Sequence, residues 1–247
     1  MSIRELVKSV IIRLELPLTQ NLKYDIYTKR IMRRVLNKSS NCIDIGCHKG
    51  EILDEILQYA PSGKHYAFEP LPHLYKFLQD KYHGKNITLF PVALFNTKGV
   101  TSFKYVVNAP AYSGIKERKY DFPNPEISEL IVNTNLLDNL IPEDEQIDFI
   151  KVDVEGAEFP VLQGGIKTIC RCKPVIIFEF GLGAADHYGV KPETVYDFIT
   201  SDCGLVISTL KGFLKENEKL SKENFSRLYL DRLEYYFVAY NNFIPAG

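Results

Sequence analysis

Two short segments of the chain hold residues whose types and spacing could do chemistry. In the first, Asp44, Gly46 and Gly50 form a D-x-G-x-x-x-G pattern between a short apolar run and a helical pattern. A strand that turns on glycines into a helix brings backbone N–H groups close to a ligand, and the helix N-terminus favours negative charge or a polar group there. The dinucleotide fingerprint G-x-G-x-x-G differs, because His48 stands where its second glycine would be. The pattern therefore favours a nucleotide-type cofactor that has no pyrophosphate.

The strands that follow supply two more candidate contacts for such a cofactor. Residues 64–69, KHYAFE, predict a strand that ends at Glu69, and an acid there can accept hydrogen bonds from both hydroxyls of a ribose. Residues 86–93 predict a third strand, whose end at Ala93 would bound an adenine. S-adenosylmethionine fits these positions, since it presents an ammonium and a carboxylate where NAD presents two phosphates. The alternative is an ordinary tight turn from a strand into a helix, because short glycine motifs also occur by chance.

The second segment, QIDFIKVDVEGAE over residues 146–158, combines a buried strand pattern with a cluster of acids. Asp153 and Glu155 fall at the carboxyl end of this strand, and Glu179 lies near the end of a later buried strand, on the same rim. Crowded carboxylates repel one another and raise a pKa unless a cation or a protonated group joins them. They suit a general base, a pair that orients a hydroxyl group, or a site for a hard metal ion. The alternative for Glu155 and Glu158 is that they favour the first turn of a helix through its dipole.

The elements that must position these residues alternate between strands and helices. This alternation predicts a Rossmann-like α/β fold with a mostly parallel sheet and helices on both faces. Ligands in such sheets bind beyond the carboxyl ends of the strands, where the candidate residues fall. The last two strand patterns could form an antiparallel hairpin at one edge. The predicted strands span residues 42–45, 64–69, 86–93, 100–107, 129–134, 147–152, 174–180, 205–210 and 233–240.

Three segments lie outside this alternation. Residues 1–40 are expected to form an N-terminal helical cap. It carries an apolar helical stripe between residues 7 and 14, and its second helix, over residues 24–36, would cover the mouth of the cofactor site. Residues 108–125 have the composition of a long loop, in which Tyr112 and Ser113 would suit a hydroxylated substrate. The alternative for this loop is a surface segment without contacts. Residues 211–224 are strongly charged and are expected to form a solvated loop.

Composition describes an ordinary globular chain. The 247 residues are 45% hydrophobic and 25% charged, with a net charge of -1, so charge gives no support to a nucleic-acid partner. The length favours one domain with appendages. Five cysteines without paired C-x-x-C spacing indicate neither a disulfide framework nor a structural zinc site, which favours a reducing compartment. Since no run of about 18 apolar residues occurs, a cytoplasmic protein without a membrane span is expected, and a homo-oligomer is left open.

Together these motifs resemble the FkbM-type S-adenosylmethionine-dependent methyltransferases. The resemblance extends from about residue 24 to about residue 210. It is carried above all by IDFIKVDVEGAE at 147–158, with DIGCHKG at 44–50, AFEP at 67–70, PVAL at 91–94 and PVIIFEF at 174–180. It implies a seven-strand class I methyltransferase fold, with residues 41–247 as the methyltransferase domain. In the family the methyl group commonly goes to a hydroxyl oxygen of a sugar or a polyketide-like natural product, so a small-molecule or glycan acceptor is expected.

The resemblance leaves two schemes for activating the acceptor. In the first, Asp153 takes the proton of the hydroxyl group and Glu155 orients the substrate, while Tyr112, Ser113 and Glu179 contact the acceptor. In the second, Asp153 with Glu179 or Glu155 holds a divalent cation that lowers the pKa of the hydroxyl group. The metal-free scheme is favoured, because no histidine joins the acids and a neutral acceptor needs only one base.

Two other functions share part of this pattern. A nicotinamide-dependent oxidoreductase would share the strand, the glycine turn and the acid that binds ribose. The chain lacks the middle glycine of that motif and shows no evident Tyr-x-x-x-Lys pair. A non-catalytic cofactor-binding module would keep the fold without the chemistry. Methyl transfer from S-adenosylmethionine is the expected function, and these two are its alternatives.

Overall fold

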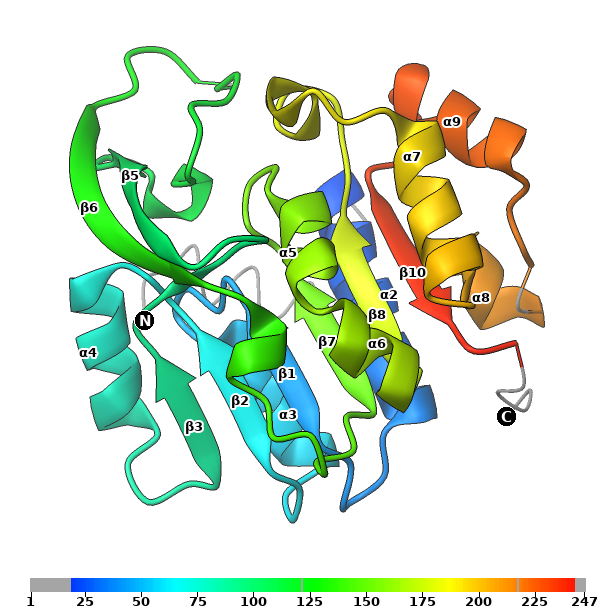
Figure 1. Cartoon of the computed structure of the whole chain (residues 1–247), viewed down its shortest axis with the longest axis horizontal. Helices are drawn as coiled ribbons and strands as arrows, with labels where there is room; N and C mark the ends of the chain where they lie inside the picture. The colour runs from blue at the N-terminus through cyan, green and yellow to red at the C-terminus, as the bar shows by residue number, and fades with distance from the viewer. Residues whose placement is uncertain (1–18, 121, 217, 243–247) are drawn as a thin grey trace.

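Seven strands form the central sheet of the computed structural model, which describes residues 19–120, 122–216 and 218–242. Their order is β3-β2-β1-β7-β8-β10-β9, and β10 is antiparallel to both of its neighbours (Figure 1). The other pairings are parallel, which confirms the predicted sheet with its antiparallel edge. The strands are β1 (Cys42–Ile45), β2 (His65–Phe68), β3 (Ile87–Phe90), β7 (Phe149–Val152), β8 (Val175–Glu179), β9 (Val206–Thr209) and β10 (Tyr236–Tyr240).

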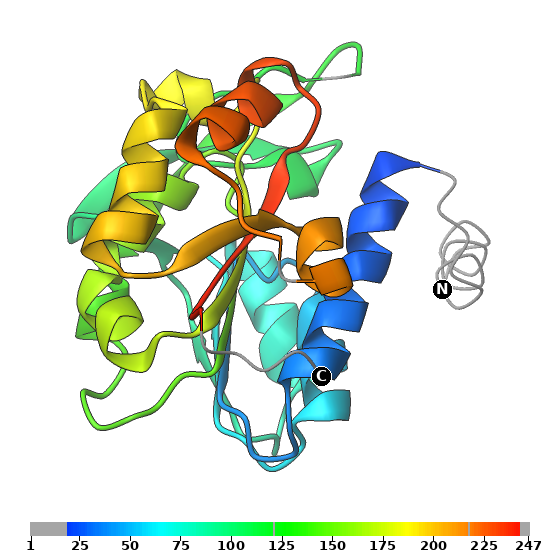
Figure 2. The same ribbon diagram turned by 90° about the vertical axis from the view of Figure 1, so that its right-hand side faces the viewer.

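Helices cover both faces of this sheet (Figure 2). Side chains alternate along each strand, so that Ile43 and Ile45 of β1 enter one apolar core and Cys42 enters the other. The first core is covered by α5 (Glu158–Gly164), α6 (Ile166–Cys172), α7 (Pro192–Asp197) and α9 (Lys222–Leu230). The second is covered by α2 (Gln20–Val35), α3 (Glu51–Tyr59), α4 (Pro72–Lys81) and α8 (Leu210–Glu216).

A smaller sheet lies beyond the carboxyl ends of the large one (Figure 1). Its order is β4-β6-β5, with β4 (Ala93–Leu94), β5 (Gly99–Val106) and β6 (Ile127–Asn135). The predicted third strand over 86–93 is therefore wrong in its second half, because Ala93 pairs with Thr134 of β6. Pro91 follows β3 directly, and a proline has no N–H group to donate to a strand ladder.

The solvated loop predicted over 211–224 is also wrong, because α8 and the start of α9 occupy most of it. Phe213 of α8 is fully buried, and its ring meets the ring of Tyr240 edge-on with 4.8 Å between centroids. Phe225 of α9 is fully buried in the core on the opposite face. Lys211 and Lys215 are exposed on the outer side of α8, as expected for a short amphipathic helix.

The helix predicted over residues 24–36 is confirmed as α2. It begins earlier, at Gln20, because the side chain of Thr19 accepts a hydrogen bond from the backbone N–H of Leu22. α2 packs against α3 and α8. The helical stripe predicted between residues 7 and 14 lies outside the described residues. Within the described ranges, no helix is both long enough and apolar enough to cross a membrane.

Replacing Phe213 by Ala should lower the free energy of unfolding by about 3–5 kcal/mol, because a fully buried ring is removed and a cavity is left. Urea unfolding followed by circular dichroism measures the change. Lys211→Ala, an exposed change on the same helix, is the matched control and should stay within about 0.5 kcal/mol of the unaltered protein. A Phe213→Ala protein as stable as this control would contradict the packing of α8.

Candidate active site

The turn after β1 is held tightly against the turn after β7. Gly46 has a φ of +79°, and a Cβ atom at this position would lie 1.9 Å from the carbonyl oxygen of Asp153. In the other direction, the backbone N–H of Asp153 donates to the carbonyl oxygen of Ile45 at 3.0 Å. Glycine is therefore required at position 46 by the close approach of two chain segments as well as by its left-handed conformation.

Gly50, the last residue of the predicted cofactor turn, lies at the start of α3 and does not line the cavities described below. It is the N-cap residue of α3, and a Cβ atom there would lie 2.3 Å from the hydroxyl oxygen of Tyr82. That hydroxyl donates to the carbonyl oxygen of Gly50 at 2.7 Å. Gly46 lines both cavities described below, whereas Gly50 lines neither. The structure thus gives Gly50 a role in packing α3 against α4 and does not bring it to the cavities.

Asp44 lies beneath this turn and lines the larger of the two cavities. Its side chain is only 2% exposed, and Oδ2 has no hydrogen-bond partner among the described residues. Burial raises the pKa of the Asp44 carboxyl to about 7, although the charge of Lys151, its register partner on β7, opposes the shift. A buried carboxylate with an unused oxygen is costly on its own, which makes Asp44 a candidate for binding a positively charged or donating group.

Glu69 lines a smaller, mostly apolar pocket. Its two oxygens accept hydrogen bonds from the backbone N–H groups of His48 and Leu71, both at 2.9 Å, so the carboxylate is fixed in place. Burial raises the pKa of Glu69 to about 7 against the effect of these two hydrogen bonds. Ala93 reaches the pocket from β4 of the small sheet and not, as predicted, from the end of β3. The apolar lining includes Phe68, Leu71, Leu74, Ala93, Leu94 and Phe103.

The two cavities meet at the turns that follow β1 and β7. The larger one has a volume of about 1210 Å³ and is lined by residues of α2, α3, β8 and β10 as well as these turns. Five residues line both cavities, namely Gly46, His48, Ala111, Asp153 and Glu155. Two joined cavities of this kind can hold a ligand with an apolar ring system at one end and charged groups at the other.

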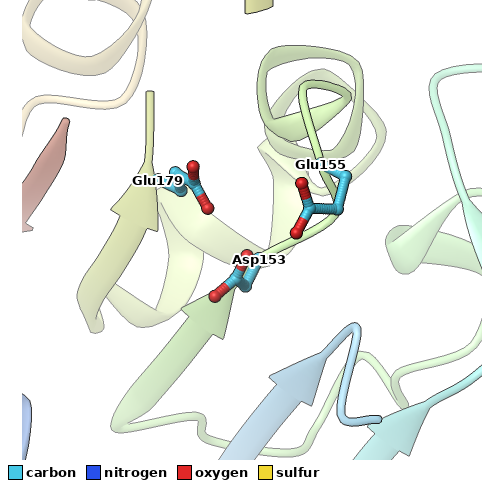
Figure 3. Close-up of side chains that lie close together, drawn as sticks. All are labelled: Asp153, Glu155 and Glu179. Carbon is cyan, nitrogen blue, oxygen red and sulfur yellow. The ribbon is translucent and has the colours of Figure 1, made fainter. Parts of the chain in front are cut away.

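Three carboxylates converge where the cavities meet (Figure 3). Asp153, Glu155 and Glu179 each offer one oxygen, and these oxygens lie within 4.8 Å of one another. Figure 3 shows Asp153 just after β7, Glu179 at the end of β8 and Glu155 on the turn that follows Asp153. The structure therefore brings together the acids that the sequence places on one rim. Glu158 instead accepts hydrogen bonds from two backbone N–H groups of the turn, at 3.0 and 3.1 Å.

The loop that contains Tyr112 and Ser113 contributes to both cavities. Ser113 lines the apolar pocket, and its Oγ atom accepts a hydrogen bond from the backbone N–H of Val106 at 3.0 Å. Tyr112 lines the larger cavity, with the guanidinium group of Arg118 5.3 Å from the centre of its ring. Arg118 also forms an ion pair with Glu155. The loop is therefore attached to the acidic turn, and the alternative of a loop without contacts is wrong.

A buried lysine and a tyrosine hydroxyl contact one acid of the carboxylate cluster. Lys151 is 4% exposed and donates to Asp153 Oδ2 at 2.8 Å, while the hydroxyl of Tyr236 donates to the same oxygen at 2.5 Å. Burial opposes the charge on Asp153, but the charge of Lys151 and hydrogen bonds with Glu179, Lys151 and Tyr236 outweigh it and lower the pKa of Asp153. Burial, followed by the charge of Asp153, raises the pKa of Glu179 well above its usual range. The opposite directions of these two shifts favour the ionised form of Asp153 beside the protonated form of Glu179.

Carboxylate oxygens are the donors that a hard divalent cation prefers. In this cluster, however, two fixed positive charges already neutralise two of the three acids. Lys151 contacts Asp153, and Arg118 contacts Glu155. A divalent cation at this place would have to compete with both side chains.

The predicted site residues do not include Lys151 and Tyr236. A signal for Lys151 exists, because it lies two residues before Asp153 on a strand and so shares its face. Tyr236 reaches the cluster because it pairs with Glu179 in the antiparallel register of β8 and β10. These two strands are far apart in the sequence, and their register cannot be inferred from the residue pattern.

The comparisons with known proteins agree with this fold. Residues 44–207, more than half of the chain, match the family model described as the methyltransferase FkbM domain. The chain belongs to this family, as its motifs predict. The expected seven-strand class I methyltransferase fold is likewise confirmed.

Two relatives illustrate the similarity. The 2-O-methyltransferase NoeI of Sinorhizobium fredii (strain NBRC 101917 / NGR234) is 28% identical over 149 residues, which are 53% of this chain and 59% of that protein. The crystal structure of methyltransferase FkbM from Methylobacillus flagellatus KT has a TM-score of 0.51 at 15% identity, over 83% of this chain and 44% of that chain. The matched region thus spans less than two thirds of each relative, and the structural likeness concerns the fold alone.

Gly46→Ala should destabilise the protein strongly, because the new Cβ atom would enter the space of the Asp153 carbonyl oxygen. Gly84→Ala is the matched control, since Gly84 also has a positive φ, +74°, but its Cβ position has no described atom within 4 Å. The control should cost roughly 1–2 kcal/mol through backbone strain, and Gly46→Ala about 1–3 kcal/mol more. Urea unfolding measures both. Equal losses would show that the two turns do not depend on their close contact.

Asp44→Asn should remove part of the pH dependence of stability in the ligand-free protein. Folded Asp44 keeps its proton up to about pH 7, whereas an unfolded aspartate loses it near its model value of 3.8. Between these values the folded state binds more protons, so the free energy of unfolding falls as pH rises. The fall attributable to Asp44 is on the order of 4 kcal/mol.

Urea unfolding from pH 4 to pH 8 tests this expectation. Asp44→Asn should be more stable than the unaltered protein at pH 8 and similar to it at pH 4. Asp80→Asn, at an exposed position on α4, is the control and should follow the unaltered protein throughout. Parallel curves for Asp44→Asn and the control would show that Asp44 titrates normally.

Proposed function

We propose that this chain transfers the methyl group of S-adenosylmethionine to a hydroxyl oxygen of a sugar or natural-product acceptor. The observation that carries the proposal is the junction of an apolar pocket with a carboxylate-lined cavity at the turns after β1 and β7. Methyltransferase activity as a class follows from the family to which the chain belongs. The identity of the donor and of the acceptor is what we add.

The residues around the junction fit this methyl donor. Glu69 lines the apolar pocket and is held by two backbone N–H groups, and its remaining lone pairs suit the hydroxyls of a ribose. Leu71 and Ala93 supply an apolar wall for an adenine. Asp44 has an oxygen without a partner among the described residues, which suits the ammonium of the methionine half. A bound cation would offset the cost of burying the charge of Asp44.

Each residue of the site would have a separate role in the methyl transfer. S-adenosylmethionine, when bound, supplies a methyl group on a positively charged sulfur. Asp153 would accept the proton of the acceptor hydroxyl as the new bond forms, a contribution of ~10²- to 10⁴-fold. Glu155, held by Arg118, would orient the acceptor, and Tyr112 and Glu179 would bound it. Holding the two reactants in line can supply roughly 7 to 11 kcal/mol of the barrier.

The choice of a hydroxyl acceptor is supported by the name of one relative. NoeI is called a 2-O-methyltransferase, and it is 28% identical to this chain over the matched residues. An oxygen acceptor also agrees with the carboxylate cluster, because an alcohol needs a base to take its proton at neutral pH. The nicotinamide oxidoreductase alternative has lost its support, since the chain belongs to a methyltransferase family.

A metal-dependent form of the same reaction is the second candidate. It is motivated by the three carboxylate oxygens that lie within 4.8 Å of one another. We favour the metal-free form, because Lys151 and Arg118 already neutralise Asp153 and Glu155. The two forms differ in their response to a chelator, which the experiment below uses.

Calorimetric titration and an acceptor screen test the proposed function. S-adenosylmethionine should bind and NADH should not. Incubation of hydroxylated acceptors with an isotopically labelled methyl donor, followed by mass spectrometry, should give a product that carries one added methyl group on oxygen. Binding of NADH alone, or labelled product only on nitrogen or carbon acceptors, would overturn the proposal.

Asp153→Asn should keep the fold and the affinity for S-adenosylmethionine while lowering the turnover by ~10²-fold or more, because an amide cannot take the proton. Turnover and calorimetric affinity are measured on the same preparation, with Asp80→Asn as a control away from the cavities. In the metal-free form, EDTA should leave the rate unchanged. If EDTA silences the unaltered protein and Mg²⁺ restores it, the metal-dependent form is correct. Near-normal turnover of Asp153→Asn would exclude both forms.

A further inference from the structure

One oxygen of Asp153 is held by two donors that come from different strands. Lys151 Nζ lies 2.8 Å and the hydroxyl oxygen of Tyr236 lies 2.5 Å from Oδ2. Lys151 Nζ also lies 4.7 Å from the centre of the Tyr236 ring, so the cation packs on the ring whose hydroxyl shares its acceptor. The three groups therefore form a closed arrangement around a single carboxylate oxygen.

The register of the large sheet produces this arrangement. Side chains alternate along β7 and into the residue that follows it, so Lys151 and Asp153 point to the same face. The parallel register of β7 with β8 continues from Asp153 to Glu179, and Glu179 pairs with Tyr236 in the antiparallel register of β8 with β10. Asp153, Glu179 and Tyr236 thus lie in one row across three neighbouring strands. The hydroxyl of Tyr236 also lies 3.4 Å from Glu179 Oε2.

Both donors approach Oδ2 of Asp153, and neither approaches Oδ1. A carboxylate whose one oxygen is bound by two fixed donors cannot rotate without breaking both contacts, so the direction of its other oxygen is set. Asp153 lines both cavities at their junction. This is the place where a methyl donor and an acceptor would meet.

We propose that Lys151 and Tyr236 are positioning residues that bind Oδ2 of Asp153 and thereby direct Oδ1 toward the hydroxyl group of the acceptor. This inference rests on the proposed function, and it adds two residues to the predicted site. Lys151 supplies a fixed positive charge, and Tyr236 supplies a hydrogen bond from β10. A base that is held in this way needs no reorientation when the acceptor binds.

The charges around Asp153 agree with this role. Burial opposes its ionisation, but the charge of Lys151 and hydrogen bonds with Glu179, Lys151 and Tyr236 lower the pKa of Asp153. Burial and the charge of Asp153 raise the pKa of Glu179, which favours its protonated form beside Asp153. The titratable and charged groups that surround Asp153 are Asp44 from β1, Lys151 from β7, Glu155 from the turn, Glu158 from α5, Glu179 from β8, Tyr236 from β10 and Arg118 from the long loop.

The transfer step balances with these groups. The acceptor oxygen forms a bond to the methyl carbon, the carbon–sulfur bond breaks with its electron pair passing to sulfur, and the hydroxyl proton passes to Asp153 Oδ1. Release of this proton to water restores the carboxylate. Lys151 and Tyr236 keep their contacts with Oδ2 throughout and neither gains nor loses a proton.

Tyr236→Phe tests this role, because it keeps the ring over Lys151 and removes only the hydroxyl. We expect kcat to fall on the order of 10- to 100-fold, while the KM for the acceptor and the calorimetric affinity for S-adenosylmethionine change less than about threefold. The loss of one donor to the ionised carboxylate should raise the pKa of Asp153, so that the acidic limb of the kcat profile moves to higher pH. Tyr240→Phe removes a hydroxyl from the same strand outside both cavities and should leave kcat, the KM, the affinity and the acidic limb unchanged.

A second measurement does not need an acceptor. Titration of carboxyl carbons by NMR, with the Asp153 signal assigned through Asp153→Asn, should show a higher pKa for Asp153 in Tyr236→Phe than in the unaltered protein and in Tyr240→Phe. An unchanged pKa, or equal kcat values for Tyr236→Phe and Tyr240→Phe, would overturn the positioning role. If the unaltered protein methylates no acceptor, the proposed function fails, and the NMR titration still decides whether Tyr236 sets the state of Asp153.

Discussion

The contact between Gly46 and the carbonyl oxygen of Asp153 is the constraint on which the candidate site depends. It places the turn after β1, which carries the predicted donor-binding residues, directly against the turn after β7, which carries the predicted base. A side chain at position 46 would push these turns apart. The apolar pocket and the acidic cavity would then no longer share a junction, and a methyl group held on one side could not reach a hydroxyl group on the other.

Burial of charge is the cost of this arrangement. Asp44, Glu69 and Glu158 are each at most 5% exposed, and burial raises the pKa of each to about 7. Ionised carboxylates buried in such places disfavour the folded state at neutral pH. Lys151 offsets part of this cost for Asp44 and Asp153. A cationic ligand bound beside these groups would offset part of this cost.

Much of the fold can be predicted from the sequence because the parallel strands are short apolar runs separated by helical patterns. The same pattern places Asp153 and Glu179 at the ends of two buried strands, so both can be predicted as site residues. The end of the third strand at Pro91 is harder to predict, because Ala93 belongs to a strand that pairs only with β6. The helices between residues 210 and 230 are also hard to predict, because exposed lysines surround a few buried aromatic residues in this segment. Tyr236 could not be predicted at all, because its place depends on a register between distant strands.

The insertion of β10 between β8 and β9 has a consequence for biosynthesis. A nascent chain emerges from the ribosome in sequence order. One edge of β8 therefore remains unpaired until β9, α8, α9 and β10 have been synthesised. Only when β10 pairs with it does the tyrosine hydroxyl arrive beside the aspartate. Completion of the proposed catalytic group is thereby tied to the pairing of β8 with β10, so that an incompletely folded chain would not yet be an active one.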